Sequence, residues 1–108
     1  MIVFVNNFAL KGPAAEFERV FTETSDFLRV QPGFLSHRLV RSAKDPQHYL
    51  NIALWESEAA LRAASGLAEF ADHAHRLREV ASTDPQFYQP VMERHGETAD
   101  HQLLPLAR

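Results

Sequence analysis

The sequence predicts an α+β fold of the ferredoxin-like type, with the element order β-α-β-β-α-α-β and an antiparallel sheet. Runs rich in β-branched and aromatic residues alternate with stretches whose apolar residues recur at helical intervals. Gly-Pro and Asp-Pro pairs separate many of these segments. The chain has 108 residues, 45% of them hydrophobic and 23% charged, which suits one compact domain with one core.

The first expected strand covers residues 2–10 ("IVFVNNFAL"), and the turn at Gly12-Pro13 closes it before a helix begins. A Gln-Pro-Gly sequence at residues 31–33 ends that helix. Its apolar stripe recurs every three or four residues and consists of Phe17, Val20, Phe21, Thr24, Phe27 and Leu28. This spacing is typical of an amphipathic helix that packs on a sheet.

The second and third expected strands cover residues 34–42 ("FLSHRLVRS") and 48–55 ("HYLNIALW"), and an Asp-Pro pair lies in the connection between them. Ser57 is then expected to cap the N-terminus of a short helix that runs through Ala64 and breaks near Gly66. The hairpin-like connection makes these two strands antiparallel neighbours.

A second helical stretch follows, with one apolar face formed by Leu67, Phe70, Ala74, Leu77 and Val80. Asp84-Pro85 is expected to end this region, and residues 86–94 ("QFYQPVMER") are expected to form the last strand. Pro90 within that segment indicates an edge strand or a bulge, because proline cannot donate to a central ladder.

Helices can cover only one face of such a sheet, yet the opposite face of the first and third strands is also apolar. A twofold homodimer with its sheets packed face to face, a dimeric α/β barrel, would bury that face. We expect the domain to cover residues 1–95. Residues 96–108 would then be a tail that is either flexible or in contact with the dimer partner.

Composition excludes several classes of function. The net charge of −3 favours neither nucleic acid nor an anionic membrane, and the absence of cysteine removes disulfides and thiolate chemistry. The start "MIVFVNNFAL" has no basic residue and is too short to span a bilayer, so a cytoplasmic location is expected. The pair His73 and His75 is a poor metal site, since residues two apart on a helix point in different directions.

Neutral polar groups on the strands are the main chemical feature. Asn51 and Trp55 share a strand face with Tyr49, and Asn6 shares its face with Phe4 and Phe8. One interpretation is that each amide is a satisfied polar group within the core. The other is a mostly apolar pocket in which the amides hold a phenolic or carbonyl oxygen and stabilise developing negative charge.

Other residues fit either interpretation. The phenylalanines of the first helix supply core or pocket wall, with core the more common role for such residues. His37 and Arg38 lie on the second expected strand and have no partner that the pattern identifies. We expect them at the sheet edge or at the dimer seam.

The stretches "FVNNF", "QPGFLSHRLVR" and "YLNIALWES" together resemble the antibiotic biosynthesis monooxygenase family. Within it they look most like the small oxygenases of aromatic polyketide pathways, such as those of nogalamycin and actinorhodin. The resemblance covers about residue 2 to about residue 90, and the family has the dimeric ferredoxin-like fold. It implies oxidation of an anthrone, hydroquinone or naphthol-like substrate to a quinone by O2, without metal, flavin or haem, through an enolate that passes an electron to dioxygen.

The resemblance also assigns roles to residues. Asn6 and Asn51 would hydrogen-bond the substrate oxygens and favour the enolate, and Trp55 would bind or protonate the oxygen-derived intermediate. The substrate contacts expected around these three catalytic candidates are Tyr49, Phe21, Phe70 and His73. The partners implied are a small aromatic molecule, O2 and a second copy of the chain.

Two alternatives remain at this stage. Haem-degrading monooxygenases of the same fold bind haem through a histidine in the stretch that contains His73. Those enzymes also carry a tryptophan in the preceding helix, where this sequence has Ala64. The other alternative is a small quinol oxidase or a non-catalytic small-molecule-binding protein, because fold does not fix function.

Overall fold

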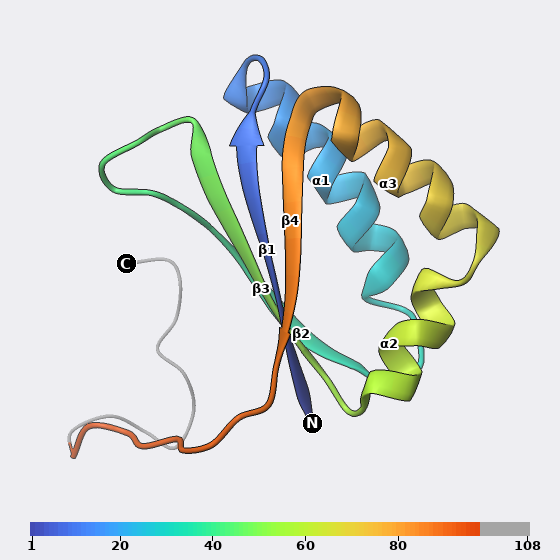
Figure 1. Ribbon diagram of the computed structural model, residues 1–108, viewed down its shortest axis with the longest axis vertical. Helices are drawn as coiled ribbons and strands as arrows, with labels where there is room; N and C mark the ends of the chain where they lie inside the picture. The colour runs from blue at the N-terminus through green and yellow to red at the C-terminus, as the bar shows by residue number, and fades with distance from the viewer. Residues whose placement is uncertain (98–108) are drawn as a thin grey trace.

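The structure, a computed structural model, describes residues 1–97 and has the predicted element order. The elements are β1 (Ile2–Leu10), α1 (Ala14–Leu28), β2 (Phe34–Arg41), β3 (His48–Trp55), α2 (Glu58–Ser65), α3 (Ala68–Val80) and β4 (Ala81–Tyr88). The strands form one antiparallel sheet in the order β2-β3-β1-β4. All three helices lie on the same face of that sheet (Figure 1). The ferredoxin-like α+β fold is confirmed.

Strict alternation along β3 defines the two faces of the sheet. Its odd-numbered residues, from Tyr49 to Trp55, are buried under the helices, and its even-numbered residues are partly exposed on the other face. The cross-strand register carries this pattern to β1, where Asn6 lies opposite Asn51 and Phe8 opposite Tyr49. The polar pair Asn6/Asn51 therefore faces the helices.

The apolar core is divided into two clusters. One joins Phe8 and Tyr49 of the sheet to Phe17 and Phe21 of α1. The other gathers around Trp55 and includes Ile2, Ala53, Leu61 and Ala64. In the register of β1 and β3, the asparagine row lies between the Phe8/Tyr49 row and the rows of Ala53 and Trp55. The amides thus lie at the seam between the two clusters.

Helix ends follow the predicted signals. The Ser57 hydroxyl caps α2 by accepting a hydrogen bond from the Ala60 N–H at 3.1 Å. Pro13 occupies the N-cap position of α1, and Gly33 adopts a positive φ of 86° in the turn that follows this helix. These local features hold the helices above the sheet face that carries Asn6 and Asn51.

The prediction for the last strand is wrong by about five residues. The strand β4 begins at Ala81, directly after α3, and ends at Tyr88, so Asp84 and Pro85 lie inside it and Pro90 lies beyond it. Proline is tolerated here because β4 is an edge strand, which pairs only with β1. The Asn6 Oδ1 accepts a hydrogen bond from the Asp84 N–H at 3.0 Å, which supports the backbone beside the proline.

A β-bulge interrupts β2 near its start. Phe34 pairs with Trp55 and Ser36 pairs with Leu54, so one extra residue is inserted between them. Because of this shift, Phe34 and His37 both face the helices although they are three residues apart.

No helix within residues 1–97 is long and apolar enough to cross a membrane. After β4, residues 89–97 contain no helix or strand. Most of the tail expected at residues 96–108 lies outside the described residues.

Candidate active site

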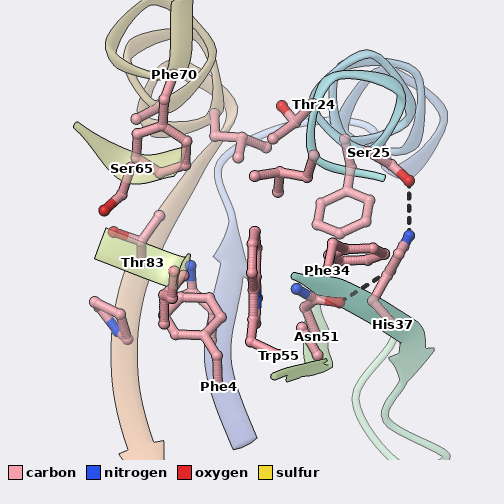
Figure 2. Close-up of a pocket in the computed structure, with 18 of the residues that line it drawn as sticks. Phe4, Thr24, Ser25, Phe34, His37, Asn51, Trp55, Ser65, Phe70 and Thr83 are labelled. Carbon is pink, nitrogen blue, oxygen red and sulfur yellow. Dashed lines mark hydrogen bonds between the residues drawn. The ribbon is translucent and has the colours of Figure 1, made fainter. Parts of the chain in front are cut away.

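A cavity of about 280 Å³ lies between the sheet and the helices, and every helix and strand contributes to its wall. Its lining is mostly apolar, with a few polar side chains that converge on it (Figure 2). The volume is close to the lower end of the range for small-molecule sites, roughly 300–1,000 Å³.

The side chains of Asn6 and Asn51 line the cavity from adjacent strands, directly opposite each other in the ladder. A protein group lies within hydrogen-bond distance of each amide oxygen: the Asp84 N–H bonds Asn6 at 3.0 Å, and His37 Nδ1 lies 3.2 Å from the Asn51 oxygen. An asparagine amide has one oxygen and one NH2 group. With both oxygens occupied, the NH2 groups are the parts left to bind a ligand.

Asn51 belongs to a chain of polar side chains that leads out of the cavity. His37 Nε2 lies 2.6 Å from the Ser25 hydroxyl oxygen, and the other ring nitrogen contacts Asn51 (Figure 2). Burial lowers the pKa of His37 below its usual 6.5, the hydrogen bond to Asn51 opposes that change, and the charge of Arg29 adds to it. The imidazole is therefore neutral at pH 7.

Trp55 forms part of the cavity wall and is 1% exposed. Its ring meets that of Phe34 edge to face, with centroids 5.1 Å apart. The indole N–H makes no hydrogen bond to any of residues 1–97. No fully buried side-chain nitrogen or oxygen in this part of the chain lacks a partner, so the indole nitrogen retains some accessible surface. This N–H is thus an unused donor that borders open space, available to a bound molecule.

Aromatic rings and two arginines complete the enclosure. The rings of Phe4 and Phe87 lie with their centroids 5.5 Å apart on the β1–β4 side, where Phe87 is exposed to solvent. Arg62 and Arg78 also reach the lining, and Arg62 is paired with Glu58 on the helix surface. The apolar lining strengthens any hydrogen bond made to the amides.

The structure brings together five of the seven residues proposed from the sequence. Asn6, Asn51, Trp55, Phe21 and Phe70 all line the cavity.

Tyr49 and His73, the other two substrate contacts expected from the sequence, do not line this cavity. Tyr49 lies on the predicted strand face, but it packs against Phe17 and donates a hydrogen bond to Glu18 beyond the end of the cavity.

His73 packs between helices. Its ring centroid lies 5.3 Å from that of Phe27 of α1. Its Nε2 lies 3.4 Å from a Glu69 carboxylate oxygen, and its Nδ1 lies 2.8 Å from an Arg76 guanidinium nitrogen. Because both nitrogens are engaged there and neither belongs to the cavity lining, this residue does not fit the role of a haem ligand. His37 does line the cavity, but Ser25 and Asn51 occupy its nitrogens. Within residues 1–97 no group of three or more histidine and acidic side chains is arranged to hold a metal ion.

Several lining residues were missed at the level of sequence. His37 was expected at the sheet edge or dimer seam without a partner; β2 is an edge strand, but the register of β2 with β3 directs this side chain into the cavity. Thr83 and Pro85 were missed because the last strand was predicted to begin after them. Alternation counted backward from Leu39 of β2, which packs against the core, would have placed His37 on the inner face.

Together, the fold and the cavity define a small α+β protein with a mostly apolar cavity between sheet and helices, lined by paired amides. The model of the antibiotic biosynthesis monooxygenase family matches residues 1–76, and the chain belongs to that family. It is 36% identical over 104 residues to deoxynogalonate monooxygenase of Streptomyces nogalater, which covers 96% of this chain and 80% of that protein. The family and the monooxygenase class predicted from the sequence are confirmed.

Two further relatives are informative. The crystal structure of SnoaB, a cofactor-independent oxygenase from Streptomyces nogalater, matches with a TM-score of 0.79 and 35% identity, over 91% of this chain and 97% of that one. A mycobilin-producing heme oxygenase of Mycobacterium tuberculosis is 35% identical over 72 residues, 66% of this chain and 69% of that protein. The first relative matches a larger share of this chain.

Proposed function

We propose that this chain is a cofactor-independent monooxygenase that oxidises an anthrone- or hydroquinone-like aromatic of polyketide type to a quinone with O2. The observation that carries the proposal is the pair Asn6/Asn51, whose oxygens are engaged and whose NH2 groups remain for a ligand inside an apolar cavity. Similarity to a cofactor-independent oxygenase over nearly the whole described chain supports it.

The proposed chemistry begins with loss of a proton from the substrate. The two NH2 groups hydrogen-bond the phenolic or carbonyl oxygen and stabilise the negative charge of the enolate, which the apolar surroundings would otherwise disfavour. The enolate passes one electron to O2, which yields a substrate radical and superoxide. These combine to form a carbon–oxygen bond, and the product is a peroxide anion.

Breakdown of the peroxide completes the reaction. The O–O bond breaks as the carbon loses its remaining hydrogen, which leaves a carbonyl group on the substrate and releases the second oxygen atom as water. The overall change converts a CH2 group and O2 to C=O and H2O. The free indole N–H of Trp55 is the donor available to the oxygen-derived group during these steps.

The test is aerobic oxidation of a model anthrone with excess chelator, comparing the native protein with Asn6→Ala, Asn51→Ala and Trp55→Phe variants. Removal of one preorganised donor is expected to lower kcat by roughly 10²–10³-fold. Asn7→Ala is the matched control for Asn6→Ala, because Asn7 is the next residue of β1 and its side chain contacts His48 on the other face. Equal activity of the Asn6 and Asn7 variants, or a native rate no better than that of buffer with anthrones and naphthols alike, would refute the proposal.

We also propose that the chain forms a homodimer through the sheet face away from the helices. No helix within residues 1–97 covers this face (Figure 1). Its partly exposed apolar residues are Val3, Val5, Val40, Leu50, Ile52 and Leu54. Two such sheets packed together would bury these side chains. Light scattering should give twice the mass of the 12.3 kDa chain, and Ile52→Glu should give a monomer. A monomeric native protein at micromolar concentration would contradict the proposal.

A further inference from the structure

The polar chain from Ser25 to Asn51 connects three elements. Ser25 lies on α1, His37 on β2 and Asn51 on β3, and the contacts are 2.6 Å and 3.2 Å. Asn51 is 5% exposed, and the amide oxygen points to the imidazole while its nitrogen lies on the opposite side, toward Trp55 (Figure 2). The orientation of this amide decides whether the cavity presents a donor or an acceptor.

We propose that His37 is a positioning residue whose imidazole, held by the Ser25 hydroxyl, fixes the Asn51 amide with its NH2 group toward the cavity. The importance of that orientation for catalysis rests on the proposed oxygenation, but the orientation itself follows from hydrogen-bond chemistry and can be tested separately.

Donor and acceptor roles run in one direction along the chain. An amide oxygen only accepts, so the nitrogen that faces it, His37 Nδ1, must carry the proton. A neutral imidazole has one N–H, so Nε2 is an acceptor and the Ser25 hydroxyl donates to it. Within residues 1–97, His37 is the partner of that hydroxyl, so the Ser25 O–H and the His37 N–H are both used as donors and the Asn51 NH2 group remains for a ligand.

The reverse arrangement would turn the Asn51 NH2 group to His37 and its oxygen to the cavity. A bound enolate oxygen would then face an acceptor, which repels negative charge. Asn6 offers an independent parallel, because the Asp84 backbone N–H bonds its amide oxygen and so leaves its NH2 group for the cavity. Two amides oriented alike make a site for an oxyanion.

The surroundings of the ring keep it neutral and in place. Phe21 and Phe34 contact the imidazole with ring centroids 5.6 Å and 5.8 Å away. The charged groups nearby are Arg29, whose charge disfavours protonation, and Asp26, which borders the same outer hollow as His37. Because burial lowers the pKa of His37, the neutral ring can accept a hydrogen bond from the Ser25 hydroxyl at neutral pH.

The direct test is the tautomer of His37, read from long-range ¹H–¹⁵N spectra of protein labelled at histidine. The expected result is a protonated Nδ1 and an unprotonated Nε2 in the native protein, and a mixture of tautomers in Ser25→Ala. Thr22→Ala is the matched control on the same helix, since its hydroxyl bonds the Glu18 carbonyl at 2.7 Å and it should leave the tautomer unchanged. A native Nε2–H tautomer would overturn the inference whatever the activity.

A second variant tests the Asn51 contact without removing it. In Asn51→Asp a carboxylate would accept the Nδ1–H bond, so the pKa of His37 should rise, while the NH2 donors are lost and turnover falls as in Asn51→Ala. An unchanged His37 titration would show that the two side chains are not in contact, against the inference.

Activity gives the third readout. His37→Phe keeps aromatic packing with Phe21 and Phe34 but removes both hydrogen bonds, and it should lower kcat by about 10–100-fold, as loss of a supporting contact does elsewhere. KM should change less, because the cavity wall remains. If Asn51→Ala abolishes turnover while His37→Phe and Ser25→Ala retain the native kcat, the inference fails and the proposed function stands. If the native protein oxidises no substrate, the proposed function fails and the tautomer still decides the orientation.

Discussion

Replacement of Gly33 by alanine should destabilise the protein by a large fraction of its folding free energy. Gly33 has a φ of 86°, and an added Cβ would lie 2.5 Å from the Cβ of Ala60 on α2. Its carbonyl accepts a hydrogen bond from Glu56 N–H at 2.8 Å, which ties the start of β2 to the end of β3. The strain would therefore arise next to Phe34 and Trp55, at one end of the cavity.

The magnitude follows from two separate costs. A non-glycine residue in the left-handed region costs roughly 1–2 kcal/mol. Overpacking against Ala60 adds about 1–3 kcal/mol, because that atom belongs to a helix and cannot swing away. The sum is about 2–5 kcal/mol in a protein of this size, for which the total is about 5–15 kcal/mol. The fall in Tm should be at least about 8 °C.

Urea unfolding of Gly33→Ala, Ala60→Gly and the double variant separates the two costs. Ala60→Gly alone should cost about 1 kcal/mol, the usual penalty for glycine in a helix. In the double variant the clash is gone, so the free energies should be non-additive by about 1–3 kcal/mol. A loss below about 0.5 kcal/mol for Gly33→Ala, or strict additivity, would refute the reasoning.

Three further outcomes are expected. Tyr49→Phe should leave kcat/KM unchanged and cost about 0.5–1.5 kcal/mol of stability, because this side chain lies outside the cavity and its hydroxyl donates a hydrogen bond to Glu18. A tenfold loss of kcat/KM would contradict that placement. Titration with haemin should give the same absorption spectrum for the native protein and His73→Ala, because Glu69 and Arg76 hold the imidazole. A Soret band present in the native protein and lost in the variant would instead show that His73 binds haem. The pKa of His37 is lower in the folded than in the unfolded protein, so its contribution to stability is complete above pH 6.5 and is lost as the pH falls toward the folded pKa. His37→Phe should therefore flatten the dependence of the unfolding free energy on pH below 6.5, and an unchanged slope would show that His37 is not its source.

The sequence alone determined the elements and the faces of the strands. Apolar residues at helical spacing predicted α1 and α3, and alternation along residues 48–55 placed Asn51 and Trp55 on one face. These features are local, because periodicity and turn residues act within a few residues of the chain. They placed Asn6, Asn51 and Trp55 on strand faces with aromatic neighbours, and the family resemblance then selected these three as catalytic candidates; all three line the cavity.

Only the tertiary structure decided how far the cavity extends and which other side chains enter it. Alternation assigns Tyr49 a face, but its position along the sheet relative to α1 removes it from the cavity. The bulge that puts Phe34 on the same face as His37, and the pairing that keeps Pro85 within β4, depend on contacts between strands distant in sequence. His73 has an apolar helix face to join, and the packing of α3 on α1 directs it to Phe27 rather than to the cavity. Periodicity fixes direction from the backbone, whereas the distance between side chains depends on how the elements pack.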